Sequence, residues 1–331
     1  MEEWKRLGVL GEGSYAIVYL AVVISQKEHT SNVVAVKSSK PCCYVSLQKE
    51  QRILELFKGC EEILQCYFYQ ETIENGRRTY NLFMEYTPCG TLGDLIKKGS
   101  LSEKEVITYT RMLLKGLRSI HKEGIIHCDL KPANILLFPS SDDNAKYQLK
   151  IADFGLSNTI GDANVGLGEI MFRGTPIYMS PESIIGLMGT ALDIWSLGCI
   201  VIEMMTGFSP WTNIQSIEEL MWKLGLLQEV PKIPDELNWD CKNFLSKCFA
   251  KDHRERWSAW DCKNFLSKCF AKDHRERWSA AMLLDHPFIQ KEYPTSSMFN
   301  PSSFFSYDIV SSSMFNPSSF FSYDIVSYVS H

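Results

Sequence analysis

Apolar runs alternate with glycine and polar turns over residues 5–37, the pattern of strands in an antiparallel sheet. A further strand is expected over residues 80–85, after the hairpin turn that Glu74-Asn75-Gly76 predicts. Between these segments, residues 46–58 carry leucine, isoleucine and phenylalanine at helical spacing. The first part of the chain therefore predicts a sheet accompanied by one amphipathic helix.

Beyond these strands the hydrophobic spacing becomes helical. Ser102 followed by Glu105 forms a capping box that opens a long amphipathic helix through His121. The order of elements predicts an α+β fold with a small β-rich lobe over about residues 1–86 and a larger α-helical lobe over about residues 90–288.

The most apolar run, Ile194–Ile202, lies between Asp193 and Glu203. It is too short to span a bilayer, which takes about 20 apolar residues, so it predicts a buried core helix. The whole chain has 331 residues, 45% hydrophobic and 22% charged, which is typical of globular proteins with about two lobes or domains.

A net charge of −5 gives no electrostatic reason to expect nucleic acid or an anionic membrane as a partner. The first six residues lack the apolar segment of a signal peptide, so the eleven cysteines are expected to be reduced thiols. We expect a monomer in the cytoplasm, with the nucleus as a second possible location.

Two perfect tandem repeats stand out. Trp239–Ala259 recurs as Trp260–Ala280, and Ser296–Ser311 recurs as Ser312–Ser327. Two copies are too few for a stacked-repeat fold, and zero divergence indicates either a very recent duplication or an error in assembling the sequence. Our hypothesis is that one copy of the first repeat packs in the helical lobe and the other forms an added helix and loop on the surface.

Residues 289–331, which contain the second repeat, form a tail rich in serine, phenylalanine and tyrosine without helical periodicity. We expect this tail to be disordered. The alternative is that its repeated Phe-Phe-Ser-Tyr-Asp is a docking motif for a partner.

The chemistry is concentrated in His127–Asn134 and in Asp153-Phe154-Gly155. An acid, an amide five residues later and a second acid before a glycine are what phosphoryl transfer from a nucleotide needs. Asp129 can orient an attacking hydroxyl and accept its proton, and Asn134 and Asp153 can hold magnesium ions.

A glycine-rich turn follows Leu10, with Gly11 and Gly13 before Val18. Glycine lets main-chain amides approach phosphates closely. Lys37 stands at the end of the next strand, directly after Val34-Ala35-Val36.

With the segment Gly174–Glu182, these motifs resemble a eukaryotic serine/threonine protein kinase over about residues 4–288. The resemblance implies the bilobal kinase fold, ATP and Mg²⁺ as cofactors, and protein substrates. It implies that Lys131 contacts the γ-phosphate and that Thr175 shapes the platform for the substrate. It gives the residues that bind ATP as Leu10, Gly11, Gly13, Val18, Ala35, Lys37, Glu50, Met84, Glu85 and Thr87.

The resemblance also implies structural roles. Glu50 pairs with Lys37, and Asp193 holds the main chain of the catalytic loop. Glu182 pairs with an arginine late in the lobe, which the duplication leaves as Arg256 or Arg277.

The glycine loop, the His127–Asn134 loop and the Gly174–Glu182 segment look most like plant mitogen-activated protein kinase kinase kinases of the short MEKK-like branch. This implies mitogen-activated protein kinase kinases as substrates. One residue departs from the usual family pattern, because Cys128 stands where most kinases have arginine.

That arginine commonly clamps a phosphorylated residue of the activation loop. Between Asp153 and Gly174 the only hydroxyl residues are Ser157 and Thr159. We therefore expect activity that does not require phosphorylation of this loop.

Two rival functions compete with a protein kinase. A pseudokinase scaffold would follow if the duplication disrupted the helical lobe, but the residues for catalysis are all present. A small-molecule phosphotransferase is disfavoured by the Gly174–Glu182 segment, which serves protein substrates in the family.

Overall fold

The computed structural model describes residues 3–25, 30–41, 43–160, 174–184, 186, 188–212, 214–227, 229–249 and 279–291, and the structural statements below concern these residues. They fall within one compact unit, Met1–Tyr293. The expected tail over 289–331 lies almost wholly outside the described residues, so its disorder stays a prediction.

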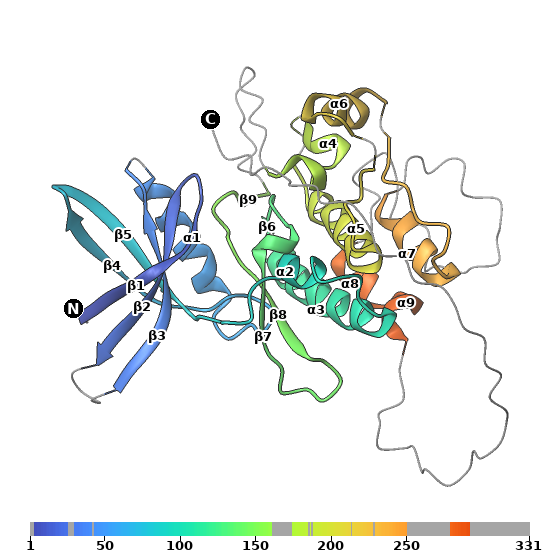
Figure 1. The fold of residues 1–331 in the computed structure, drawn as a ribbon. Helices are drawn as coiled ribbons and strands as arrows, with labels where there is room; N and C mark the ends of the chain where they lie inside the picture. Colours follow the sequence, from blue (N-terminus) through green and yellow to red (C-terminus); the bar gives the residue numbers. More distant parts are fainter. Residues whose placement is uncertain are drawn as a thin grey trace, which may run out of the picture. The chain divides into compact units, whose positions relative to one another are not determined.

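The N-terminal part is a five-stranded antiparallel sheet in the order β1-β2-β3-β5-β4 (Figure 1). Its strands are β1 (Glu3–Glu12), β2 (Ala16–Ser25), β3 (Thr30–Ser39), β4 (Cys66–Glu74) and β5 (Arg77–Met84). The predicted hairpin joins β4 to β5. Asn75 and Gly76 both have positive φ, 51° and 74°, as a type I′ turn requires.

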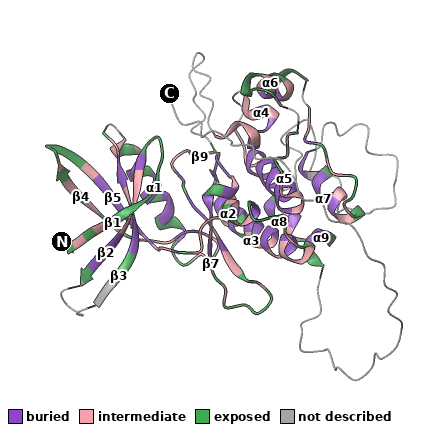
Figure 2. Ribbon diagram, viewed as in Figure 1, coloured by how far each residue is buried: buried purple, intermediate pink, exposed green. Residues whose placement is uncertain are grey.

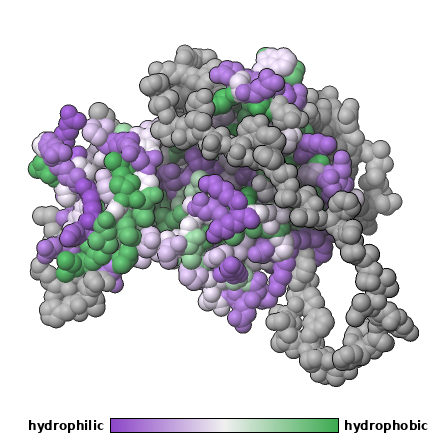
Figure 3. Space-filling view, viewed as in Figure 1, coloured by the Kyte–Doolittle hydropathy of each residue, from purple (hydrophilic) through white to green (hydrophobic). Residues whose placement is uncertain are grey.

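The sheet curls until its two edges meet. Arg6 of β1 forms a salt bridge of 2.7 Å with Glu74 of β4, although these strands are at opposite ends of the sheet order. Inside the curl, Phe83 contacts Trp4 edge-on at 5.2 Å between ring centroids and stacks on Phe68 at 4.3 Å. The outer face over β1–β3 keeps exposed apolar residues, which Figure 3 shows as a hydrophobic surface.

Helix α1 (Tyr44–Leu56) packs against the sheet with Leu47, Ile53 and Leu54 buried. It lies two residues earlier than the predicted 46–58. The sequence carried no start signal because the N-cap, Cys43, makes no side-chain capping bond. Phe57, expected inside the helix, is its C-cap.

The C-terminal part is helical, as predicted. Its helices are α2 (Leu92–Ile96), α3 (Glu103–Lys122), α4 (Pro181–Ile184), α5 (Ala191–Thr206), α6 (Ile217–Trp222), α7 (Trp239–Cys248), α8 (Ala280–Leu284) and α9 (Pro287–Gln290). Its short strands are β6 (Ile125–Ile126), β7 (Ile135–Pro139), β8 (Tyr147–Ile151) and β9 (Asn158–Thr159). Single 3₁₀ turns cover Pro132–Asn134 and Pro176–Tyr178, and a π-helical turn covers Lys223–Leu227.

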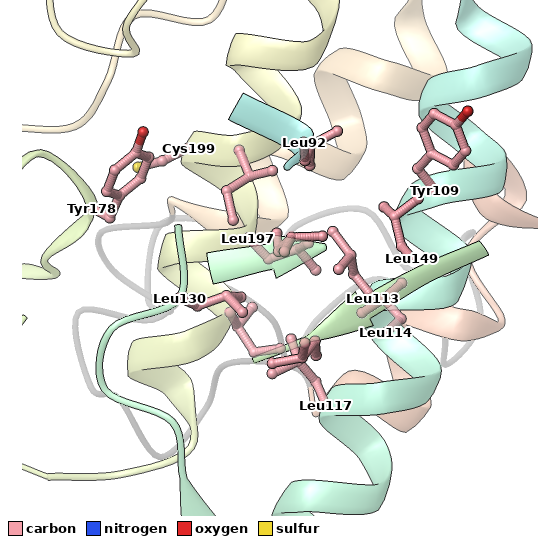
Figure 4. Close-up of a cluster of buried hydrophobic side chains, with 14 of the residues drawn as sticks. Leu92, Tyr109, Leu113, Leu114, Leu117, Leu130, Leu149, Tyr178, Leu197 and Cys199 are labelled. Atoms are coloured by element: carbon pink, nitrogen blue, oxygen red, sulfur yellow. The ribbon is translucent and has the colours of Figure 1, made fainter. Parts of the chain in front are cut away.

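Two helices form the centre of this lobe. The predicted capping box opens α3, because the Ser102 hydroxyl accepts from the Glu105 N–H at 3.3 Å and the Glu105 carboxylate accepts from the Ser102 N–H at 3.0 Å. Helix α5 is buried over almost its whole length, which confirms the predicted core helix (Figure 2). Figure 4 shows Leu113, Leu114 and Leu117 of α3 in the core that also contains Leu197 of α5. No described helix is long and apolar enough to cross a membrane.

The first copy of the 21-residue repeat supplies α7, and Phe244, Leu245 and Cys248 are fully buried. The helix approaches α5 closely at Gly198, where an added Cβ would lie 2.6 Å from the Cβ of Cys248. The described part of the first copy, residues 239–249, therefore packs in the core. Of the second copy only Ser279 and Ala280 are described, where they begin α8, so the expected place of the rest on the surface stays a prediction.

Because the two copies are identical, a deletion cannot tell them apart, but matched point substitutions can. Phe244→Ala should lower the free energy of unfolding by about 3–5 kcal/mol, since it leaves a cavity beside Phe288 and His286. Chemical denaturation of this variant and of the matched variant Phe265→Ala measures the difference. An equal loss from both would contradict a core that takes this helix from the first copy alone.

Candidate active site

A cleft of about 720 Å³ lies between the sheet and the helical lobe. Every residue expected to bind ATP lines it, together with Lys131, Asn134 and Asp153. The sequence analysis missed Leu64, Leu136 and Ala152, which add apolar walls. The position of Ala152, directly before Asp153, could have identified it.

Lys37 reaches across the cleft to two carboxylates. Its Nζ lies 2.8 and 2.7 Å from the two Glu50 carboxylate oxygens and 2.8 Å from Asp153 Oδ1. The Glu50 side chain is only 1% exposed, so water contributes little to stabilising its charge and the contact with Lys37 takes the place of water. Burial alone would lower the pKa of Lys37, but the two carboxylates outweigh burial and raise it, so the ammonium stays charged.

The same ion pairs act on Asp153. Burial favours the neutral acid, but the nearby Lys37 ammonium outweighs that effect and lowers the pKa of Asp153. Asp153 keeps a 48% exposed side chain facing the cleft. A charged carboxylate is therefore presented at the position where the resemblance implies a metal ligand.

Asp129 is held from two sides by Thr175 and Lys131. The Thr175 hydroxyl donates to Asp129 Oδ1 at 2.8 Å and accepts from Lys131 Nζ at 2.8 Å. Lys131 Nζ also pairs with Asp129 Oδ2 at 2.8 Å. These contacts join the His127–Asn134 loop to the Gly174–Glu182 segment in one network.

Asn134 completes this network. Its amide NH₂ donates to the Asp129 main-chain oxygen at 2.9 Å and to Asp129 Oδ2 at 3.1 Å. These bonds orient the amide so that its oxygen remains to serve as a ligand. An amide oxygen and the Asp153 carboxylate are the hard oxygen donors that suit Mg²⁺, so the residues present fit that ion.

The catalytic loop is anchored to α5 through Asp193. Its carboxylate accepts the main-chain N–H groups of His127 at 2.9 Å and Cys128 at 3.0 Å, as expected. A third contact, from His121 Nε2 at 2.8 Å, was not expected. Burial is opposed by these bonds, which lower the pKa of Asp193 and keep it charged. No motif in the sequence marks His121, because its contact with Asp193 joins two helices that are far apart in the sequence.

Two residues of the site have a left-handed main chain. Cys128 and Asp153 have φ of 66° and 65°, a conformation that costs non-glycine residues about 1–3 kcal/mol. The surrounding bonds to Asp193 and Lys37 hold these conformations. Gly174 comes so close that an added Cβ would lie 2.6 Å from the Cys128 oxygen, which ties the end of the activation segment to the catalytic loop.

The platform after Thr175 is fixed to α5. The Tyr178 hydroxyl donates to the buried Glu203 carboxylate at 3.0 Å, and Ser196 Oγ donates to the Tyr178 oxygen at 2.8 Å. Burial raises the pKa of Glu203 to about 7, against the opposing hydrogen bond from Tyr178. Sequence reasoning missed both contacts, since each joins residues about 20 positions apart without a motif.

Some expected features cannot be compared with the structure. Glu182 is buried, but Arg256 and Arg277 lie outside the described residues, so the choice between them stays open. Of the two hydroxyl residues in the activation loop, Ser157 is fully buried and donates to the His127 oxygen at 3.2 Å. Thr159 lies in β9, paired with Ile125. Residues 161–173 lie outside the described residues.

Comparison with known proteins identifies the family of this chain. The protein kinase domain family matches residues 4–289. Mitogen-activated protein kinase kinase kinase 20 of Arabidopsis thaliana is 39% identical over 264 residues, which cover 78% of this chain and 75% of the relative. Mitogen-activated protein kinase kinase kinase 17 of the same plant is 38% identical over 78% of this chain and 67% of its own length. Mitogen-activated protein kinase kinase kinase 18 is 34% identical over 88% of this chain and 78% of its own length.

The family match, the relatives and the fold all indicate a protein kinase. The chain belongs to the protein kinase family, as a serine/threonine protein kinase related to plant mitogen-activated protein kinase kinase kinases.

Proposed function

We propose that this kinase transfers the γ-phosphate of ATP to serine or threonine hydroxyls of mitogen-activated protein kinase kinases. The observation that carries the proposal is the network that joins Asp129, Lys131 and Thr175 beside the nucleotide-sized cleft. The substrate class rests on the names of the relatives.

In this proposal the cleft binds ATP between its two apolar walls. Val18 and Ala35 line it from the sheet, and Leu136 lines it from β7. Glu85 follows β5 at the hinge, the point where the sheet continues into the helical lobe. Its N–H already donates to the Gln65 main-chain oxygen at 3.1 Å, which leaves the Glu85 carbonyl as the group to meet adenine. Lys37, fixed by Glu50, presents its ammonium to the phosphates.

Asp129 accepts the proton of the substrate hydroxyl as its oxygen forms the new bond to the γ-phosphorus, and the bond from that phosphorus to the β–γ bridging oxygen breaks to release ADP. Its carboxylate is oriented by Thr175 and Asn134, so little reorganisation accompanies the transfer. Lys131 balances the charge beside it. The amide oxygen of Asn134 and the carboxylate of Asp153 would hold Mg²⁺, which supplies neutralisation of phosphate charge when bound.

The pseudokinase alternative gains no support. The Lys37–Glu50 pair and the Asp129 network are both formed, and the first repeat copy builds the core helix that the lobe needs. We propose that the chain acts as a monomer in the cytoplasm, with the nucleus as a second location.

Asp129→Asn should lower the rate of phosphate transfer by roughly 10²-fold or more, because the amide cannot accept the hydroxyl proton. Transfer from radiolabelled ATP to a generic protein substrate and to a mitogen-activated protein kinase kinase measures this. The control is Asp235→Asn, a change in an 83% exposed side chain that pairs with Lys232. Equal rates for Asp129→Asn and the wild type would overturn the assignment of the base.

Removing phosphate from the activation loop should leave the rate unchanged within about twofold, since Cys128 provides no positive charge to clamp a phosphate and Ser157 is buried. The test compares the rates before and after treatment with a phosphatase, with phosphorylation sites mapped by mass spectrometry. Thr159→Ala, tested in parallel, should also retain activity. Loss of activity after phosphatase treatment, together with a phosphate mapped to Thr159 before it, would refute this expectation.

A further inference from the structure

The side chain of Glu85 makes contacts that are separate from those of its main chain. Its carboxylate turns to Lys150, whose Nζ lies 2.8 and 2.9 Å from the two oxygens. The same carboxylate accepts the Gln65 N–H at 2.7 Å. The Glu85 carboxylate is therefore bound by both Lys150 and Gln65 at the point where the sheet continues into the helical lobe.

The pair with Lys150 crosses from the hinge to the helical lobe. Lys150 lies on β8, and its ammonium also sits over the Phe138 ring of β7 at 4.9 Å from the centroid. The side chains of Lys150 and Glu85 are only 13% and 14% exposed. Water screens such a pair less than a surface pair, so its geometry resists change more strongly.

Gln65 fixes the other side of this arrangement. Its side-chain amide donates to the main-chain oxygens of Cys60 at 2.9 Å and Ile63 at 2.7 Å, and its oxygen accepts the Gly59 N–H at 2.7 Å. The segment between α1 and β4 is thereby held as one piece. This segment also bonds to β8, because Leu64 N donates to the Ile151 oxygen at 3.0 Å.

The three residues therefore form a hinge clamp, defined here as Gln65, Glu85 and Lys150. Any rotation at the hinge that moves the Glu85 carbonyl must strain bonds of the clamp. The clamp is intact in the same structure in which Lys37 contacts both Glu50 and Asp153, the arrangement suited to phosphate binding.

We propose that Lys150 and Gln65 are positioning residues for the nucleotide. They act through Glu85, by fixing the hinge carbonyl where adenine is recognised. The inference rests on the proposed ATP binding and deepens it. Neither residue touches the Asp129 network, so the clamp should govern the affinity for ATP and leave the chemical step nearly unchanged.

Lys150→Met keeps an unbranched side chain of similar length and removes the ammonium that contacts Glu85 and Phe138. It should raise KM for ATP and the dissociation constant of a fluorescent ATP analogue by roughly three- to tenfold, with kcat within about twofold of the wild type. Lys150→Arg keeps a cation for the carboxylate and should restore both values. The control is Lys232→Met, which removes a 79% exposed lysine.

Glu85→Gln provides a second variant in case Lys150→Met does not fold, as judged by thermal unfolding. It keeps an oxygen for the Gln65 N–H and loses only the ion pair, so it should raise the same two constants. Its main-chain carbonyl is unchanged, which separates the clamp from the direct contact with adenine.

Several results would overturn the inference. One is an unchanged analogue affinity in both variants, and another is an increase in kcat at constant KM, which would make the clamp a restraint on lobe movement. A third is an equal loss of affinity in Lys150→Arg and Lys150→Met, which would indicate packing alone. If the wild type itself failed to bind the analogue, the proposed function would fall, and that outcome is distinct from the other three.

Discussion

The buried carboxylate of Asp193 is the constraint on which the catalytic geometry depends. Its helix, α5, is covered on all sides, so the charge must be satisfied inside the protein. The three groups that satisfy it are the N–H groups of His127 and Cys128 and the ring of His121. Because a buried charge left unpaired is costly, the loop that carries Asp129 has one favourable position relative to the core.

From this anchor, short contacts extend to both reacting partners. On the substrate side, Asp129 is joined to Thr175, and Tyr178 returns to α5 through Glu203. On the nucleotide side, Asp153 is joined to Lys37 and so to Glu50 on α1. Catalysis of phosphoryl transfer depends chiefly on positioning and charge, and these contacts supply both from a rigid centre.

The sequence predicted what depends on neighbouring residues and missed what depends on distance. The capping box of α3 and the turn at Asn75 and Gly76 followed from local motifs, and the family resemblance gave most of the nucleotide-binding residues that line the cleft. The contacts of His121, Glu203 and Lys150 join residues separated by 25 to 72 positions. No periodicity encodes such pairs, because only the packing of two elements brings them together. The predicted start of α1 was two residues late because its N-cap residue makes no side-chain hydrogen bond, so no local motif marks the first turn of the helix.

The position of the duplication explains why the fold can contain it. Between Phe249 and Ser279 the connection has 29 residues, of which the duplication adds 21. Counted simply as connecting chain, this is slightly less than two doublings of length, so its closure entropy costs only about 1 kcal/mol. The core contacts of Phe244 and Cys248 precede the insertion and are unaffected by it. An added segment at this point therefore leaves α5, and with it Asp193 and the catalytic loop, in place.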